Sequence, residues 1–374
     1  MNIIVNAILF HEKPRGVGRY LNNLLKNLAL IDKKNNYYIY YAPWMKEYEF
    51  LDIQQDNFTF ICVKVPKNKL LRNLYQAFVF PFIILKHNPD LLHIPDTSPV
   101  FFTTCKTIST IHDLAEFHVP EKYSKIQSKI RKFIVKNQLK NSHHVLTVSH
   151  YSKNDMLKLL RKPSEKISVV YNGVDYKKFN KQVYNNLPKV ASQKKYFLYV
   201  GELERTKNVS CIVNAYSLLP SNIKEDYHLI LVGRKGNDFR NIYNLVQEKK
   251  IQSKVHFLDY VSDLELVSLY NNCVAFIFPS IFEGFGLPVL EAMACEAPVL
   301  CSNASCLPEI AGDAAMLFNP YDVNDLSNKM ELIIKRPDLS HKLIENGLKR
   351  VREFCWKTCA KNTLDVYMKV INTK

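Results

Sequence analysis

The chain has 374 residues, of which 47% are apolar or aromatic and 23% are charged. This length and composition are typical of a folded protein with two domains, and they exclude a disordered or fibrous chain. The formal net charge of +16 indicates an anionic partner, because such an excess attracts polyanions, anionic lipid surfaces and phosphorylated small molecules.

The N-terminus begins directly with an apolar run at residues 1–6, which predicts a first β-strand. It has no basic segment, long apolar stretch and cleavage site of the kind that marks a secretory signal, so we expect a cytoplasmic protein. The nine cysteines include no C-x-x-C pair, a pattern typical of reduced thiols rather than of a disulfide framework or a zinc site.

A glycine-bearing loop follows the first strand. Gly16 and Gly18 precede leucines at helical spacing (Leu21, Leu24, Leu25 and Leu28), so the loop containing Arg15 opens into a helix N-terminus and forms a potential anion site. The loop lacks the third glycine of the dinucleotide fingerprint, and no convincing acid follows the next strand. These two absences count against an NAD-dependent enzyme.

The most apolar window covers residues 74–85. It is too short to cross a membrane and contains Gln76 and Pro81, so it predicts a core or interfacial segment.

A basic amphipathic helix is predicted over residues 122–140. Five lysines share one face, and three apolar residues (Ile126, Ile130 and Phe133) fall on another; the lysines are Lys125, Lys129, Lys132, Lys136 and Lys140. Two interpretations remain open: a solvated face on a packed helix, or a peripheral dock onto anionic lipid. Nucleic acid is not expected as a partner, because no recognition motif accompanies the charge.

Short apolar runs then alternate with helical patterns, which predicts parallel sheets in an α/β protein. The predicted strands cover residues 106–111, 145–148, 167–170, 196–200, 228–232, 255–258, 274–279 and 299–301. The stretch 175–195 lacks apolar periodicity and predicts the linker between two domains. The final pattern, 356–370, is helical and could pack on either domain.

The second half contains a candidate anion site. After strand 274–279, a loop leads to Pro288, which suits the first position of a helix. The amides of Phe285, Gly286 and Leu287 would then point from a helix N-terminus toward the ligand edge of the sheet, where a diphosphate fits.

Two carboxylates accompany this helix. Glu283 lies in the loop and Glu291 about two turns along the helix, so one could accept from a sugar hydroxyl and the other from a ribose. The alternative for Glu291 is an acidic side chain on an exposed helix face.

The spacing of these two glutamates, in EGFGLPVLE at residues 283–291, resembles the E-x7-E motif of the retaining glycosyltransferases of family four, which have the two-domain GT-B fold. Four further blocks resemble that family in its order: TVSHYSK (147–153), VYNGVD (170–175), VGELERTKN (200–208) and LPEIAGDAA (307–315). The resemblance implies two Rossmann-like domains with parallel sheets facing across a cleft. Residues 1–178 would form the acceptor domain and residues 190–355 the nucleotide-sugar donor domain, with the helix of residues 356–374 packing back on the first.

The resemblance also implies roles for individual residues. Glu283 would bind the donor sugar, Glu291 the ribose, and Lys207 the leaving diphosphate. Phosphate and base contacts would come from Gly16, Gly18, Phe285, Gly286, Leu287 and the backbone near Tyr260 and Val261. His112 matches a histidine beside the reacting sugar, although a buried structural histidine is the alternative.

One departure from the family concerns its phosphate-binding arginine. Glu202 and Thr206 occupy the two positions where the family places that arginine, and Arg205 lies one residue away. Arg205 could supply the second positive charge.

No D-x-D triplet occurs in the chain, so we expect chemistry without a metal or other cofactor. The blocks look most like mannosyltransferases that build surface polysaccharides, which favours GDP-mannose over a UDP-hexose as donor. The acceptor would be a glycan or a lipid-linked oligosaccharide, at the inner face of the cytoplasmic membrane. The alternatives are a nucleotide-sugar epimerase on the same fold and a catalytically silent carbohydrate-binding scaffold.

Overall fold

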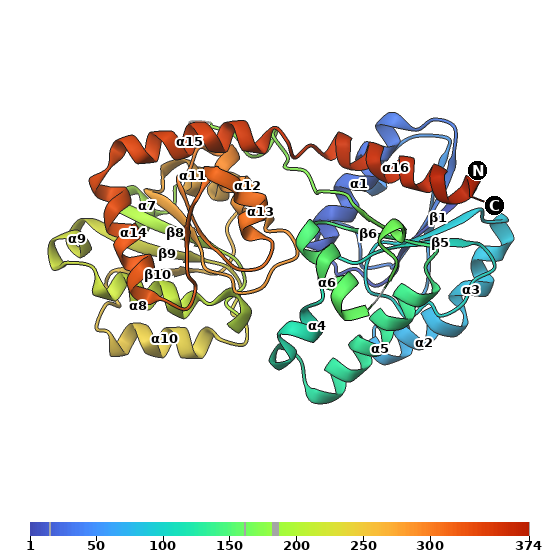
Figure 1. The fold of residues 1–374 in the computed structure, drawn as a ribbon, viewed down its shortest axis with the longest axis horizontal. Helices are drawn as coiled ribbons and strands as arrows, with labels where there is room; N and C mark the ends of the chain where they lie inside the picture. The colour runs from blue at the N-terminus through green and yellow to red at the C-terminus, as the bar shows by residue number, and fades with distance from the viewer. Residues whose placement is uncertain (15, 161, 182–186, 374) are drawn as a thin grey trace. The chain divides into compact units, whose positions relative to one another are not determined.

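A computed structural model describes residues 1–14, 16–160, 162–181 and 187–373. The chain forms two compact units (Figure 1): unit 1 comprises Met1–Gly173 and Trp356–Lys374, and unit 2 comprises Val174–Cys355. Arg15 of the glycine loop and residues 182–186 of the expected linker lie outside the described residues.

Unit 1 is built on a seven-stranded parallel sheet in the order β3-β2-β1-β4-β5-β6-β7. The strands are β1 (Asn2–Ala7), β2 (Asn36–Tyr41), β3 (Phe58–Cys62), β4 (Leu91–Ile94), β5 (Lys106–Thr110), β6 (His144–Thr147) and β7 (Ile167–Val169). β1 is almost entirely buried because helices cover both faces of a doubly wound sheet. The order reverses between β1 and β4, which is the kind of switch point where such sheets bind ligands.

The helices of unit 1 follow the predicted apolar periodicity in part. They are α1 (Val17–Ile31), α2 (Lys69–Phe78), α3 (Phe80–Ile83), α4 (Ala115–His118), α5 (Lys125–Asn141), α6 (His150–Leu160) and α16 (Trp356–Asn372). The four leucines predicted to form the inner face of α1 are fully buried. α16 packs against α1 within this unit, where Lys106 Nζ also donates to the carbonyl of Val370 at 3.0 Å.

Two helical segments of unit 1 combine buried and exposed apolar residues. The segment 74–85, predicted to lie in the core or at an interface, runs from α2 through α3 into a 3₁₀ turn (Ile84–His87): Phe80 and Ile84 are buried, whereas Phe78 and Phe82 are exposed. On α5, the buried face carries Ile134, Val135 and Leu139, and the apolar residues expected on a face apart from the lysines (Ile126, Ile130 and Phe133) are exposed. None of the helices in the described part of the chain has both the length and the apolar character needed to span a bilayer.

Unit 2 is built on a six-stranded parallel sheet in the order β10-β9-β8-β11-β12-β13. The strands are β8 (Lys195–Val200), β9 (Tyr227–Val232), β10 (Val255–Leu258), β11 (Ala275–Phe278), β12 (Val299–Ser302) and β13 (Met316–Phe318). The helices are α7 (Lys189–Ser192), α8 (Val209–Leu218), α9 (Ser221–Asp226), α10 (Phe239–Glu248), α11 (Asp263–Asn272), α12 (Leu287–Ala294), α13 (Leu307–Ala311), α14 (Val323–Lys335) and α15 (Pro337–Val351). Here the order reverses between β8 and β11.

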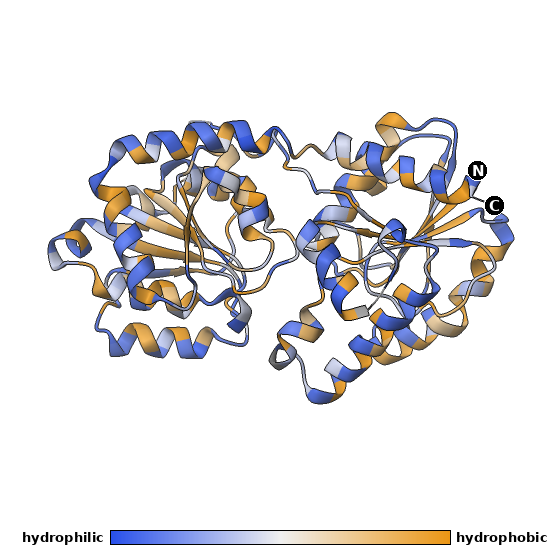
Figure 2. Ribbon diagram, in the orientation of Figure 1, coloured by the Kyte–Doolittle hydropathy of each residue, from blue (hydrophilic) through white to orange (hydrophobic). Residues whose placement is uncertain are grey.

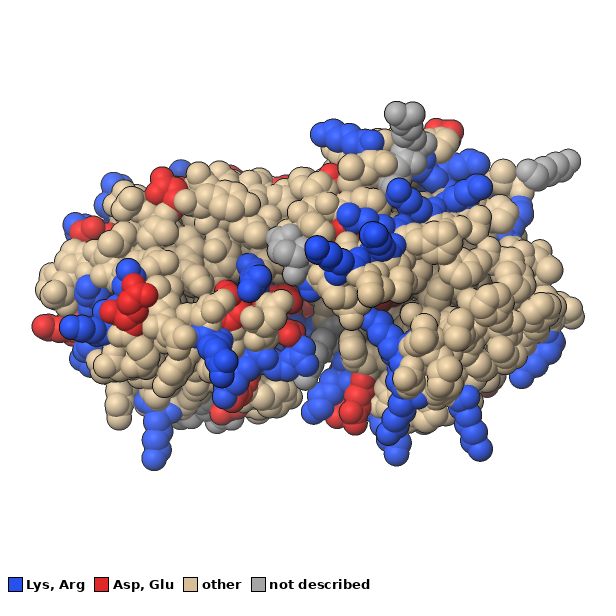
Figure 3. Space-filling view, turned by 90° about the horizontal axis from the view of Figure 1, so that it is seen from below, with Lys and Arg blue, Asp and Glu red and all other residues tan. Residues whose placement is uncertain are grey.

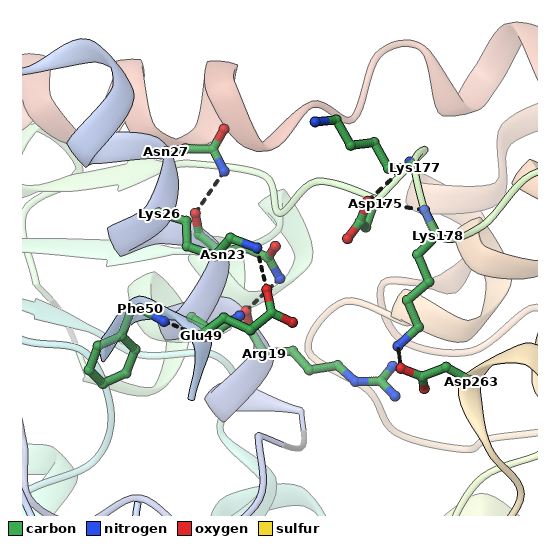
Figure 4. A network of polar contacts seen from close by, with 11 residues as sticks. Arg19, Asn23, Lys26, Asn27, Glu49, Phe50, Asp175, Lys177, Lys178 and Asp263 are labelled. Carbon is green, nitrogen blue, oxygen red and sulfur yellow. Dashed lines mark hydrogen bonds and ion pairs between the residues drawn. The ribbon is translucent and has the colours of Figure 1, made fainter. Parts of the chain in front are cut away.

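The first residues after Gly173 fold with unit 2, although the sequence assigns them to the end of the first domain and the start of a linker. The Tyr176 hydroxyl donates to the carbonyls of Val351 and Phe354. Lys178 forms an ion pair with Asp263 at the start of α11 (Figure 4). Tertiary contacts of single polar side chains fix this segment, and they leave no periodic pattern in a sequence.

A buried polar chain connects α16 to the sheet of unit 1. The Tyr367 hydroxyl lies 2.6 Å from His93 Nδ1, and His93 Nε2 lies 2.8 Å from Thr110 Oγ1, which is 3.0 Å from the Tyr20 hydroxyl. Burial, together with the charge of nearby His112, lowers the pKa of His93 to about 3, so its ring is neutral at physiological pH.

Tyr367→Phe should destabilise unit 1 by about 1–3 kcal/mol, because it leaves a buried ring nitrogen of His93 without its partner. Denaturant unfolding followed by tryptophan fluorescence reports on this unit, since both tryptophans, Trp44 and Trp356, belong to it. Tyr321→Phe is the matched control because that side chain is 77% exposed. An unchanged unfolding midpoint for Tyr367→Phe would show that the contact of Tyr367 with His93 does not stabilise unit 1.

Candidate functional site

The candidate site of unit 2 lies at the carboxyl end of β11, which pairs with β8 on one side and β12 on the other. The loops after these three strands meet there. The amide of Ile281 donates to the carbonyl of Thr206 at 3.0 Å, and the amide of Glu283 donates to Ser305 Oγ at 3.1 Å. Two hydrogen bonds thus join the loop after β11 to both of its neighbours.

Lys207 and Glu283 form an ion pair at this edge, with Nζ and Oε1 2.5 Å apart. Their side chains are 21% and 14% exposed, so the pair is largely withdrawn from water but open on one side. Lys207 closes a 3₁₀ turn (Arg205–Lys207) by donating its amide to the carbonyl of Glu204. The sequence predicted both residues for the site and missed that they contact each other.

Gly286 is the residue directly before α12, and its backbone conformation determines the direction in which the helix begins. Its φ of 96° lies in the left-handed region, and a Cβ there would approach Leu307 Cδ2 to 2.7 Å. Pro288 occupies the first turn, as expected, and no side chain caps the helix. The positive end of the helix dipole therefore lies in the same loop as Glu283, where an anion would be stabilised.

Glu291 is only 4% exposed, so the alternative of an acidic side chain on an exposed helix face is wrong. It lies on the inner side of α12 and, after burial itself, is the main influence that raises the pKa of the Cys295 thiol to about 12. Burial of this side chain on α12 is compatible with the predicted binding role. Its contact with a ribose stays a prediction.

The loops after β8 and β9 are fitted closely together. A Cβ at Gly233 would lie 1.8 Å from the carbonyl oxygen of Gly201, so a side chain is excluded there. Arg234 donates from Nη2 to both carboxylate oxygens of Glu202, at 2.7 and 2.9 Å. Sequence reasoning missed Arg234; the conformationally special Gly233 beside it was the available signal.

Three further predicted residues of unit 2 are accessible. Arg205 is exposed, and its backbone amide donates a hydrogen bond to Asn237 Oδ1 at 3.1 Å. Tyr260 lies in the loop that follows β10 and is 77% exposed, and Val261 beside it is partly buried. No contact tests the roles of these three, which stay predictions.

Gly16 and Gly18 of unit 1 are glycines for different structural reasons. Gly16 begins α1 with a φ of 44°, and the position of its missing Cβ is open space, which leaves room for a ligand. Gly18 is buried, and a Cβ there would lie 2.6 Å from the Tyr48 hydroxyl. Packing accounts for Gly18, whereas only the backbone conformation accounts for Gly16.

His112 follows β5 in unit 1 and is partly buried. Its Nε2 lies 3.0 Å from the carbonyl of Pro95, and because a carbonyl only accepts, Nε2 carries the hydrogen. The Tyr20 ring meets it edge to face at 4.8 Å, and its own carbonyl accepts from Ser152 Oγ. These contacts fix the orientation of the His112 ring, and the residue is only partly buried, so it remains accessible to a ligand.

Comparison with known proteins identifies the family. Residues 14–178 match the model described as "Glycosyltransferase Family 4", and residues 181–350 match "Glycosyl transferases group 1". The chain is a member of glycosyltransferase family four. It is 30% identical over 266 residues to O-antigen chain mannosyltransferase B of Escherichia coli, covering 70% of each chain.

Other relatives of this glycosyltransferase are less completely covered. O-antigen chain mannosyltransferase RfbU of Salmonella typhimurium is 32% identical over 61% of each chain. The mannosyltransferase WbdA of Escherichia coli is 26% identical over 72% of this chain, which spans only 34% of that protein.

Solved structures establish the GT-B fold. Sucrose-phosphate synthase from Thermosynechococcus elongatus has a TM-score of 0.79 at 22% identity, with 98% of each chain covered. Anabaena HepE in complex with UDP and glucose has a TM-score of 0.76 at 17% identity, covering 99% of this chain and 100% of that one. The glycosyltransferase thus has two Rossmann-like α/β units, as the sequence predicts.

Gly286→Ala should weaken nucleotide binding at least ten-fold, because the left-handed conformation costs a residue with a Cβ about 1–2 kcal/mol and the methyl group would displace Leu307. Calorimetric titration with GDP and UDP measures the effect.

Gly312→Ala is the matched control: its φ of 57° is equally unfavourable, but the nearest atom is Arg350 Nε at 3.4 Å, outside the site loops. We expect it to lower stability and leave nucleotide affinity unchanged. Equal loss of affinity in both variants would show that the α12 entry is not part of the site.

Proposed function

We propose that this glycosyltransferase moves a mannose from GDP-mannose onto a glycan or lipid-linked oligosaccharide during the synthesis of a surface polysaccharide. The observation that carries the proposal is the Lys207–Glu283 pair beside the N-terminus of α12. The names of its relatives, O-antigen mannosyltransferases, support the sugar and the pathway class. A UDP-hexose is the alternative donor.

The ion pair suggests how donor binding prepares the site. In the structure, the charge of Lys207 is balanced by Glu283. A diphosphate at the α12 amides would draw Lys207 toward its oxygens, and Glu283 would then be free to accept hydrogen bonds from sugar hydroxyls. The exchange replaces one charge-assisted contact by two, in a setting largely withdrawn from water where such contacts are strongest.

Breaking the bond to the sugar increases the negative charge on the diphosphate oxygens. Preorganised donors aimed at those oxygens therefore supply most of the expected rate gain. Lys207 and the amides of Phe285, Gly286 and Leu287 are such donors, with Arg205 as a second proposed cation. Because these groups can stabilise the leaving group, and because the sequence has no D-x-D triplet, we propose transfer without a required metal or other cofactor. We propose retention at the anomeric carbon because the E-x7-E spacing of Glu283 and Glu291 resembles that of retaining glycosyltransferases.

The remaining contacts are part of the proposal. Glu291 would hold the ribose, and the backbone at Tyr260 and Val261 the base. Gly16, Gly18 and His112, in unit 1, keep the roles that the family resemblance implies.

We also propose a cytoplasmic location with peripheral association at an anionic membrane, where a lipid-linked acceptor would be reached. Four of the five predicted lysines of α5 are exposed and Lys132 is partly buried beside the Phe117 ring, so the lysine face is accessible, as docking onto anionic lipid requires. In Figure 3, lysine and arginine side chains project from the surface of unit 1.

GDP should raise the melting temperature more than UDP at equal concentration. Binding to the folded state alone stabilises it by mass action, by about 2.7 kcal/mol when the ligand is at 100 times its Kd. A thermal-shift assay measures the difference, and Lys207→Ala should reduce the response to both nucleotides. A larger shift with UDP would reverse the donor assignment.

Product analysis by NMR in excess chelator should show retention at the anomeric carbon. Lys207→Ala should lower turnover about 100- to 1000-fold, the usual loss when one donor to a developing oxyanion is removed. Glu283→Gln should also lower turnover strongly, because a charged acceptor becomes a neutral one. Glu291→Gln should act mainly on donor affinity.

Lys235→Ala is the matched control, since Lys235 also lies at this edge of the sheet and pairs with a carboxylate, Asp259, at 3.5 Å. We expect near-normal turnover. An inverted product, or activity that requires added magnesium or manganese, would contradict the mechanism. Conversion of the donor without any acceptor would indicate an epimerase.

A further inference from the structure

The loop after β12 holds the backbone of Glu283 on both sides. Ser305 Oγ accepts a hydrogen bond from the amide of Glu283 at 3.1 Å, and the Cys306 thiol donates to the carbonyl of Glu283, with Sγ and O 3.2 Å apart. The next residue of the loop, Leu307, is the one that a Cβ at Gly286 would meet. We call the side chains of Ser305 and Cys306 the clamp, because together they occupy both backbone hydrogen-bonding groups of Glu283.

Cys306 contributes a buried thiol that stays protonated. Its side chain is fully buried, and burial, followed by the negative charge of Glu283, raises the pKa of the thiol well above its usual value. A protonated thiol has a hydrogen to donate to the carbonyl, whereas a thiolate could only accept. The same surroundings make Cys306 unsuited to act as a nucleophile, because the thiolate is the reactive form of cysteine.

Ser305 has a backbone conformation that is unfavourable for serine. Its φ of 53° lies in the left-handed region, which glycine adopts without a steric penalty. Strained residues of this kind persist where the surrounding structure enforces them, and they are concentrated at functional sites. Glycine would suit the path of this loop better than serine, but it would leave the amide of Glu283 without its acceptor. What the serine adds is therefore the contact with Glu283.

The rest of the loop is anchored to the sheet of unit 2. The amide of Asn303 donates to the carbonyl of Phe318, at the end of β13, at 2.8 Å, and the amide of Ala304 donates to Ser302 Oγ at 3.1 Å. Figure 2 shows the apolar strands of this sheet in orange. Because the loop is attached to a packed sheet at its start, the clamp gives Glu283 a fixed support.

We propose that Ser305 and Cys306 are positioning residues of the transfer reaction and act through Glu283. The inference rests on the role proposed above for Glu283, which is to hold the hydroxyls of the donor sugar. Groups that hold a substrate in reacting geometry must be placed to within a fraction of an ångström, and small displacements lower the rate strongly. Glu283 lies in a loop, so its backbone needs the clamp to keep such a position, while Lys207 contacts its carboxylate.

Ser305→Gly separates positioning from stability. It removes the acceptor of the Glu283 amide but also relieves the left-handed strain, which offsets the greater freedom of glycine in the unfolded chain, so the melting temperature should stay close to that of the parent enzyme. We expect kcat to fall about ten-fold, because the carboxylate loses its exact placement. Affinity for GDP, measured by calorimetry, should be unchanged, because GDP has no sugar for Glu283 to hold.

Two further variants complete this comparison. Ser305→Thr keeps the hydroxyl but adds a β-branch to a left-handed residue, so it should lower the melting temperature and retain most of kcat. The matched control is Lys250→Gly, which relieves the same strain, at a φ of 55°, in an exposed position just after α10. This control should leave kcat unchanged.

Cys306 is tested by removing its donor. Cys306→Ser keeps a donor in nearly the same place and should retain most of kcat, whereas Cys306→Ala leaves the carbonyl of Glu283 without its partner and should lower kcat about ten-fold. The matched control is Cys301→Ala, because Cys301 is also fully buried and donates to the carbonyl of Ser302 rather than to the loop of Glu283. It should lose stability and keep its turnover.

Parent-level kcat in both Ser305→Gly and Cys306→Ala, measured on folded enzyme, would overturn the inference. Glu283→Gln then separates this failure from failure of the proposed function. A slow Glu283→Gln enzyme beside normal clamp variants removes only the clamp, whereas full turnover in Glu283→Gln contradicts the proposed role of Glu283 and the clamp with it.

Discussion

The ion pair between Lys207 and Glu283 depends on the way three parallel strands end. Side by side, β8, β11 and β12 deliver their loops to one edge of the sheet, and hydrogen bonds between the loops hold the lysine and the carboxylate in contact. Neither residue is close to the other in sequence. The charges therefore meet only because the doubly wound order places β8 next to β11, and every role proposed for the donor site follows from that placement.

Backbone conformation limits this arrangement as strongly as charge does. Gly286 turns the chain into α12 through a conformation that side chains disfavour, and Gly233 allows two loops to approach to contact. Gly286 directly precedes α12, where a small shift would move the first amides of that helix, and Gly233 directly follows β9, where it approaches Gly201. The site thus obtains its precision from rigid elements and closely fitted loops, which is what electrostatic stabilisation of a leaving group demands.

Sequence reasoning correctly predicted the features that depend on residues close together in the chain. The strand runs, the leucine spacing of α1 and the entry of α12 at Pro288 were predicted because each depends on neighbours within a few residues. The contact of Lys207 with Glu283 and the pairing of Arg234 with Glu202 were not predicted, because they depend on loops that are distant along the chain. The orientation of α2, whose apolar face is partly exposed, was not predicted for a related reason. Periodicity identifies the apolar face of a helix, but only tertiary contacts such as the buried hydrogen bond of Gln76 decide which way that face points.

The positive charge of the protein is divided between two proposed binding functions. At the candidate donor site, Lys207 is already balanced by Glu283, so that site accounts for little of the net charge of +16. Residues 57–89 and 122–154 of unit 1 hold thirteen basic residues and no acidic residue. A balanced pair suits a small ligand that must bind and leave, because the carboxylate competes for the lysine when the product departs. An unbalanced basic surface suits a large anionic partner, because many weak contacts add up without any one of them being specific. The distribution of charge, more than its sum, therefore separates the part of the molecule proposed to handle the nucleotide sugar from the part proposed to meet the membrane.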